Sequence, residues 1–103
     1  MSKQILHLTI IRKWFDLIAL GKKTVDFREI KPYWTKRLRD KEFDEVHFRN
    51  GYSANSPFMR LEWQRTALRI PSPHDIPYTD DKRYCIYLGK ILEIKNWSQN
   101  EIS

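Results

Sequence analysis

The chain of 103 residues contains a single cysteine, Cys85, so no disulfide can form within it, and a metal site built from several cysteines is excluded. Cys85 lies in the apolar run 84–88, where a buried structural thiol is expected rather than a nucleophile. No apolar run approaches the ~20 residues of a membrane-spanning helix, and the first ten residues lack the hydrophobic segment of a signal peptide. We therefore expect a cytoplasmic protein without membrane association.

Common catalytic and cofactor motifs are also missing. The sequence has no G-x-S-x-G, Walker A or GxGxxG motif. Its three histidines, His7, His47 and His74, do not have the spacing of metal ligands. A lone histidine on a strand is more often structural than a ligand. We therefore expect no metal and no cofactor, and the residues alone indicate no nucleophile.

Positive charge and aromatic side chains are abundant. The formal net charge is +6 and the pI is about 9.6. This charge favours polyanionic partners, nucleic acid above all, although a merely soluble basic protein would have the same balance. Five Tyr, five Phe and four Trp suffice for a small core and leave aromatic rings for stacking. The length fits one domain over residues 1–103, with a core over 5–94.

The hydrophobic pattern predicts a mixed α+β domain with a highly curved sheet. Alternating apolar residues predict strands at 5–11, 24–28, 46–48, 59–64 and 83–94, the last with a bulge at Gly89. Apolar residues at helical spacing predict a helix over 11–20 that ends with Gly21 in a left-handed C-cap. A short helix is expected at 33–40, a Pro-rich loop at 70–82 and a loose tail at 95–103.

The first candidate site is the run GKKTVDFR at 21–28. It places the amine of Lys23 just past a helix end, and then Asp26 and Arg28 on one face of a strand. Such a group can bind a phosphate or the polar edge of a base, with the acid orienting the cations. The alternative is a capped helix that leads into an edge strand with a solvated charged face.

The second candidate is the basic segment 31–41, in which five cations and one acid are interleaved with two aromatic residues. Cations that hold phosphates, beside aromatic faces that stack on bases, are typical of single-strand recognition. Alternatively, Trp34 and Leu38 pack one helix face inward and the cations are solvated, and both readings can hold together. The candidate binding residues here are Lys31, Tyr33, Trp34, Lys36 and Arg37.

The third candidate is the run HFRNGY at 47–52. Arg49 and Asn50 carry bidentate donors, Gly51 permits close backbone approach, and Tyr52 adds a ring. The alternative is a plain hairpin turn in which Asn50 and Gly51 supply only the backbone conformation.

Taken together, these runs resemble the ASCH-domain family of the PUA-like superfamily. The pattern Gly21-x-Lys23-x-x-Asp26-x-Arg28 is similar to the family signature G-x-K-x-x-E-x-R, with aspartate in place of glutamate. The runs RKWFDLIALGKKTVDFREIKPYW, HFRNGY, PFMRLEW and YCIYLGKILEI resemble short bacterial and phage members. The likeness covers residues 5–94 and is weakest at 70–82.

The resemblance implies a small PUA-like β-barrel of about five to six mostly antiparallel strands with one or two short helices. It also implies a cleft lined by Lys23, Asp26 and Arg28, which Arg49, Asn50 and Tyr52 would border. ASCH proteins are mostly assigned to RNA binding, so the leading expectation is an RNA- or nucleotide-binding domain, with a monomer favoured.

An enzyme is the rival that the resemblance allows. Some ASCH proteins remove acetyl from acetylated cytidine with a lysine, a threonine and a glutamate. Lys23 matches the lysine, but the threonine position is Asp26, and the segment that supplies the glutamate is shortened here to 70–82. Other members are reported as ribonucleases, which needs only a lysine and polar neighbours such as Tyr33 or Tyr52. If the chain is an enzyme, Lys23 and Asp26 are the expected catalytic residues; a phage-type protein that targets a host protein is a third, weaker alternative.

Overall fold

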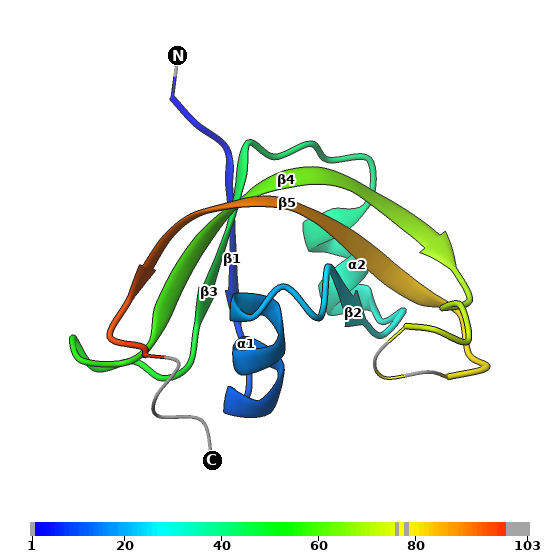
Figure 1. Cartoon of the computed structure of the whole chain (residues 1–103). Helices are drawn as coiled ribbons and strands as arrows, with labels where there is room; N and C mark the ends of the chain where they lie inside the picture. Colours follow the sequence, from blue (N-terminus) through cyan, green and yellow to red (C-terminus); the bar gives the residue numbers. More distant parts are fainter. Residues whose placement is uncertain (1, 76, 78, 99–103) are drawn as a thin grey trace.

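A strongly curved sheet of five strands forms most of the molecule, and two short helices lie on its concave side (Figure 1). The computed structural model describes residues 2–75, 77 and 79–98. The elements follow in the order β1 (Ile5–Thr9), α1 (Arg12–Ala19), β2 (Val25–Arg28), α2 (Pro32–Leu38), β3 (Glu45–Arg49), β4 (Phe58–Arg69) and β5 (Arg83–Lys95). The α+β class, the five strands and the two short helices are as predicted.

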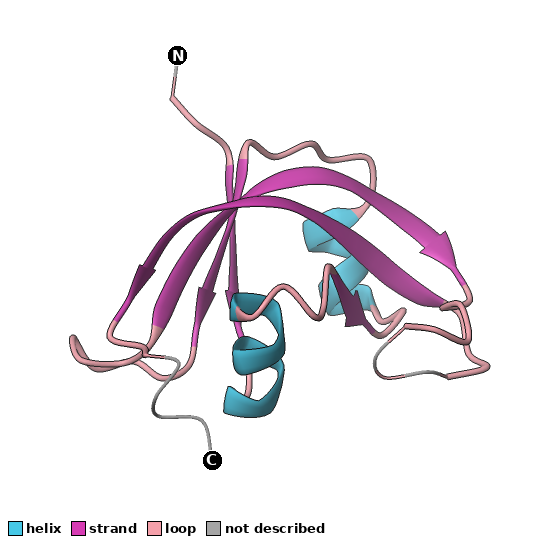
Figure 2. Cartoon of the chain, viewed as in Figure 1, coloured by secondary structure: helices cyan, strands magenta, loops and turns pink. Residues whose placement is uncertain are grey.

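The strand order in the sheet is β1-β3-β4-β5-β2, so β1 and β2 are its two edges. β1 runs parallel to β3, and the other three neighbouring pairs are antiparallel. Figure 2 shows the long β4 and β5 arching over both helices, which gives a half-barrel. We call the opening between the two edge strands β1 and β2 the seam.

The core fills the concave side of the half-barrel. Alternate residues of β1, β3, β4 and β5 point inward, as the period of two requires, and both helices contribute to the same cluster. The buried members are Leu6, Leu8, Ile10, Phe15, Ile18, Leu38, Val46, Phe48, Met59, Leu61, Tyr84, Ile86 and Leu88. The other side chains of β1, β3 and β4 therefore face outward, on the convex side of the sheet.

Several element boundaries differ from the predicted ones. β1 ends at Thr9, two residues early, because Ile11 in extended conformation serves as the N-cap of α1. β4 continues five residues past 64 to Arg69, because its end pairs with the beginning of β5. That stretch contains polar and exposed side chains, so apolar alternation alone did not mark it as a strand.

The predicted bulge at Gly89 is confirmed, within a β5 that continues to Lys95. Leu61 pairs with Ile91 and Trp63 with Leu88, so two β5 residues face one β4 residue at this point. A Cβ on Gly89 would come within 3.0 Å of the Cβ of Glu62. Bulges increase local bend and twist, which accounts for the arch of the two long strands.

The segment directly after β5 packs more closely than the expected loose tail. Trp97 packs beside Phe15 of α1, with 6.5 Å between ring centroids, and its indole N–H donates to Asp16 Oδ1 at 2.8 Å. This contact ties the segment after β5 to the first helix. Residues 99–103 of the expected tail lie outside the described part of the chain.

Candidate functional site

The turn after α1 positions the first signature residue. Gly21 has a φ of +75°, which confirms the predicted left-handed C-cap. The Lys22 N–H donates to Leu17 O at 2.9 Å and the Gly21 N–H to Ile18 O at 3.0 Å, a Schellman motif. The Lys23 N–H also donates to Leu17 O, at 3.1 Å. These bonds turn the chain sharply at the helix end and hold the backbone of Lys23 against α1.

The side chain of Lys23 is buried, with 6 % of the residue exposed. Its ammonium lies over two aromatic rings, 4.6 Å from the centroid of Phe27 and 5.3 Å from that of Trp14. Burial lowers the pKa of Lys23, while the nearby carboxylates of Asp26 and Asp75 favour its charged form. Lys23 is thus a partly desolvated amine within a small acidic and aromatic environment.

Asp26 and Arg28 form an ion pair at the seam. Asp26 is buried, and its carboxylate accepts from Arg28 Nε at 2.7 Å and from Arg28 Nη2 at 3.3 Å. The same Nη2 donates to Thr9 O at 3.1 Å. Arg28 belongs to β2 and Thr9 to β1, so this guanidinium bridges the two edge strands. The predicted arrangement, an acid that orients the neighbouring cation, is present.

Arg28 continues into a row of alternating cations and rings that we call the seam ladder: Arg28, Trp34, Arg37 and Tyr33. The Arg28 guanidinium lies 4.9 Å from the Trp34 ring centroid. Arg37 lies 5.7 Å from Trp34 and 5.3 Å from Tyr33, and it donates to the Tyr33 hydroxyl at 2.9 Å. Its other terminal nitrogen donates to His7 O at 2.9 Å. The edge carbonyls of β1 are therefore held by the two arginines of the ladder.

A cavity of about 230 Å³ opens beside the ladder, and we call it the seam cavity. Its walls come from the end of β1, the first turn of α1 and from β2. The lining residues are Thr9, Ile10, Ile11, Trp14, Asp26, Phe27 and Arg28. Two of the three signature side chains thus line the cavity, and the third, Lys23, lies against its Trp14 and Phe27 walls.

The other predicted residues lie outside this group. Lys31 is the N-cap of α2 and forms an exposed ion pair with Glu29 at 3.2 Å, and Lys36 is exposed in the last turn of α2. Asn50 does not line the seam cavity, but its side-chain amide donates to the carbonyl of the lining residue Ile10 at 2.8 Å.

Arg49 and Tyr52, expected to border the same cleft, line a different cavity. Arg49 is on the convex side of the sheet, because it follows inward-facing Phe48 on β3. The structure therefore brings together Lys23, Asp26, Arg28, Tyr33, Trp34 and Arg37, and it separates Arg49 and Tyr52 from them.

Two residues of the site were not found from the sequence. Trp14 fitted the apolar stripe of α1 and was assigned to the core, yet its ring lines the seam cavity. Asp75 belongs to the Pro-rich segment, and only the fold brings its carboxylate near Lys23. Asp75 is held there by the Ser72 N–H, which donates to its Oδ2 at 2.6 Å, and by Arg69 at 3.4 Å.

No group of three or more His, Cys, Asp and Glu side chains among the described residues is arranged to hold a metal ion. Neither described helix has the length and apolar character needed to cross a membrane. No family model matches the chain, and no curated protein or solved structure matches it either.

Proposed function

We propose that this chain is an ASCH-type, PUA-like domain that binds RNA or a nucleotide-like ligand at the seam. The observation that carries the proposal is the seam ladder, in which two guanidinium groups alternate with two aromatic rings beside a cavity. Cationic groups neutralise phosphates and aromatic faces stack on bases, and the combination is typical of single-strand binding. The net charge of +6 adds a general attraction for a polyanion.

Each residue of the ladder has a distinct role in this proposal. Tyr33 is 59 % exposed, so its ring is accessible to a base. Arg28 and Arg37 contact phosphate or a base edge, with Asp26 fixing the direction of Arg28. Trp34 is half-buried, and its ring stabilises both guanidinium groups through cation–π contacts. Lys31 and Lys36, exposed on α2, follow the backbone of a longer strand.

The size of the seam cavity indicates that it holds part of a ligand and does not enclose a whole one. Pockets that surround a whole small ligand usually measure about 300–1,000 Å³. The seam cavity, at about 230 Å³, is smaller than that range. It fits a phosphate or the edge of a base, with the remainder of the ligand lying outside on the ladder.

Binding can be tested with a fluorescently labelled, mixed-sequence single-stranded RNA and two pairs of variants. Tyr33→Leu and Arg37→Gln remove one ring and one cation of the ladder. We expect each to raise the Kd about tenfold, since stacking on one aromatic ring is worth about 1–3 kcal/mol. The controls are Leu92→Ala, an exposed apolar side chain of β5 that lines neither cavity, and Arg39→Gln, an exposed arginine just past α2.

Anisotropy titrations at several salt concentrations distinguish the outcomes. Binding that weakens with salt and depends on Tyr33 and Arg37, but not on the two controls, supports the proposal. RNA that binds all four variants equally, or that does not bind the wild type, would contradict it. A loss confined to Tyr52→Leu, measured in parallel, would locate the RNA on the convex side instead.

A hydrolase acting on RNA or on a modified nucleoside is the second candidate. The observation that favours it is the burial of Lys23, which lowers the pKa of the amine toward the range where it can act as a base. Asp26 and Asp75 would keep this amine in place while it exchanges a proton. The ribonuclease and amidohydrolase readings both need Lys23.

Product formation tests this second candidate. Wild type and Lys23→Met are incubated with the labelled RNA and, separately, with N4-acetylcytidine. Met is unbranched and apolar and so suits a buried position beside the Trp14 and Phe27 rings, and the thermal unfolding midpoint serves as the check on folding. Products that disappear in Lys23→Met would make the chain an enzyme. Salt-dependent binding without products would contradict the hydrolase and support a domain that only binds its ligand.

A further inference from the structure

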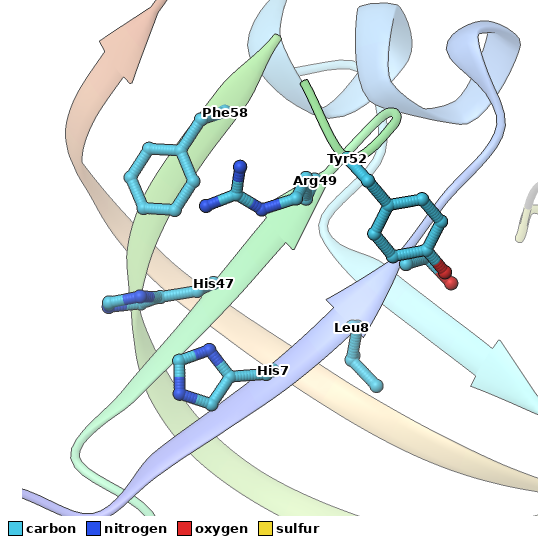
Figure 3. Close-up of a pocket in the computed structure, with 7 residues that line it drawn as sticks. His7, Leu8, His47, Arg49, Tyr52 and Phe58 are labelled. Carbon is cyan, nitrogen blue, oxygen red and sulfur yellow. The ribbon is translucent and has the colours of Figure 1, made fainter. Parts of the chain in front are cut away.

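A second cavity, of about 340 Å³, lies on the convex side of the sheet (Figure 3). It is formed by outward-facing side chains of β1, β3 and β4 and by the loop after β3. Its polar and aromatic lining residues are His7, Thr9, His47, Arg49, Tyr52 and Phe58. We call it the outer pocket. Among the described residues, Thr9 alone lines both this pocket and the seam cavity.

The register of the sheet brings the two histidines together. Parallel β1 and β3 pair His7 with His47, and the ring centroids lie 5.3 Å apart, edge to face. The next outward pair is Thr9 and Arg49, and Arg49 pairs with Phe58 of β4. Figure 3 shows the two imidazoles side by side and the Arg49 guanidinium turned toward Phe58. Three groups that can carry positive charge thus converge on one pocket.

Glu45 fixes the orientation of one of these imidazoles. Its Oε1 lies 2.9 Å from His47 Nε2 and also accepts from Arg60, while Oε2 accepts from Lys3 at 2.7 Å. These three contacts lower the pKa of Glu45 to about 2, so the group is a carboxylate and can only accept. His47 Nε2 therefore donates to Glu45 Oε1, and this contact fixes the orientation of the ring.

Aromatic rings form the other walls of the pocket. The Arg49 guanidinium lies 5.4 Å from the centroid of the Phe58 ring. The rings of His47 and Phe58 are in edge-to-face contact, with 5.3 Å between their centroids. Tyr52 is 86 % exposed, so its ring is almost entirely available to a ligand. A cationic cluster bounded by two rings is suited to a ligand that combines an anion with a planar ring. The volume lies within the usual range for small-molecule sites.

We propose that the outer pocket binds a phosphorylated planar-ring compound of mononucleotide size. Arg49 and the imidazoles of His7 and His47 hold the phosphate, and Tyr52 and Phe58 contact the ring. This site is separate from the seam and does not depend on the proposed function. The phosphate can belong to a free nucleotide or to one residue of an RNA chain, and the experiment distinguishes the two.

Binding at this pocket is expected to take up a proton. The pKa of His7 is lowered by burial and by the nearby positive groups His47, Arg37 and Arg49, so His7 is largely neutral at pH 7. A phosphate dianion beside the ring reverses that balance and raises the pKa. The affinity should therefore increase as the pH falls.

The charged groups around His47 do not reverse the expected increase in affinity at lower pH. His47 faces Glu45 on its own strand, His7 on β1 and, as its register partner, Arg60 on β4. Glu45 remains a carboxylate through the neutral range because its pKa is about 2. Its charge beside His47 is therefore constant across the pH range of the experiment.

The test uses the full chain, ¹⁵N-labelled, with adenosine 5′-monophosphate as the probe and adenosine and inorganic phosphate as comparisons. Chemical-shift changes should centre on outward-facing residues of β1 and β3 and on the loop that carries Tyr52. We expect the Kd for the monophosphate to rise roughly threefold or more between pH 6 and pH 8. Adenosine and phosphate alone should each bind about tenfold more weakly or worse, since each satisfies only half of the pocket.

Three variants separate the outer pocket from the seam. Arg49→Gln should raise the Kd for the monophosphate about tenfold. His7→Gln should reduce the dependence of that Kd on pH. Tyr33→Leu, at the seam, should leave the Kd unchanged. Shift changes confined to seam residues, an affinity indifferent to Arg49→Gln, or equal binding of adenosine and its monophosphate would overturn the proposal. Displacement of the monophosphate by RNA in an Arg49-dependent manner would support it and identify an RNA chain as the source of the phosphate.

Discussion

Two buried ionisable residues of this protein have pKa values that are shifted by different dominant causes. Lys23 lies over aromatic rings, and desolvation lowers its pKa, which favours the neutral amine. Glu45 is equally buried but accepts hydrogen bonds from Lys3, His47 and Arg60, which lower its pKa to about 2 and favour the charged carboxylate. The first environment is suited to proton exchange, and the second to holding a neighbouring ring in place.

The carboxylate of Glu45 should contribute to stability in a definite pH window. Its pKa falls from the ordinary 4.5 to about 2 on folding, so its contribution is complete above pH 4.5 and disappears as the pH falls toward 2. Glu45→Gln should lower the free energy of unfolding by about 1–2 kcal/mol at pH 7, a modest value because Lys3 and Arg60 are partly exposed. Urea denaturation between pH 7 and pH 3 measures the difference, with exposed Glu42→Gln as the control. A deficit that stays constant as the pH falls would contradict this origin.

Residue spacing predicted the seam better than the outer pocket. Asp26 and Arg28 are two apart on a strand, so alternation alone placed them on one face. The pairing of His7 with His47 depends on the register of two strands that are 40 residues apart in the chain. No local pattern specifies that register, and each histidine viewed alone resembled a structural one.

At the scale of elements, the short edge strand β1 depends on groups from elsewhere in the fold. It has one hydrogen-bonded neighbour, β3, and its other edge is exposed at the seam. Arg37 of α2 covers the carbonyl of His7, and Arg28 of β2 covers that of Thr9. Unpaired strand edges promote association between chains, so these side chains protect the sheet as well as forming the proposed site.

The end of α1 offers a test of how the signature residue Lys23 is positioned. Gly21 has a φ of +75°, and no described atom outside its neighbours lies within 4 Å of a Cβ built there. Gly21→Ala should therefore be destabilising through backbone strain alone, by about 1 kcal/mol. Urea denaturation gives the value, with Lys22→Ala as the adjacent control. A Gly21→Ala protein as stable as the wild type would contradict the strain argument.

Elements with strong apolar alternation were predicted from the sequence, and the extension of β4 was not. Leu6 and Leu8 in β1 alternate clearly with polar residues, whereas the end of β4, residues 65–69, reads as polar. That segment is a strand because residues 83–87 pair with it across the hairpin. Tertiary pairing decides such segments, and local propensity does not.

At the scale of the whole molecule, the excess of positive charge should govern any interaction with RNA. Each cation that neutralises a phosphate releases a counterion, so the slope of log K against log salt counts these contacts. Lys36 is exposed on α2 next to the ladder residue Arg37. The two should therefore affect binding in different ways.

Lys36→Gln should weaken RNA binding equally for all sequences and reduce the salt slope by about one unit. Arg37→Gln should reduce the slope similarly and also remove the support of Tyr33 and the contact with His7 O. Anisotropy titrations at four or more salt concentrations measure both slopes. An affinity that does not change with salt, in wild type or variants, would contradict a phosphate-binding role for α2.

The position of Thr9 gives the seam and the outer pocket a common wall. It lines both cavities, and its carbonyl is held by Arg28 of the proposed RNA site. A ligand that draws this guanidinium away from the strand edge would release the end of β1, which carries three of the seven residues that line the outer pocket. By thermodynamic linkage, occupancy of either cavity would then alter the affinity of the other by the same factor. The five residues of β1 would thus couple a ligand at the seam to a ligand in the outer pocket, so that each regulates the binding of the other.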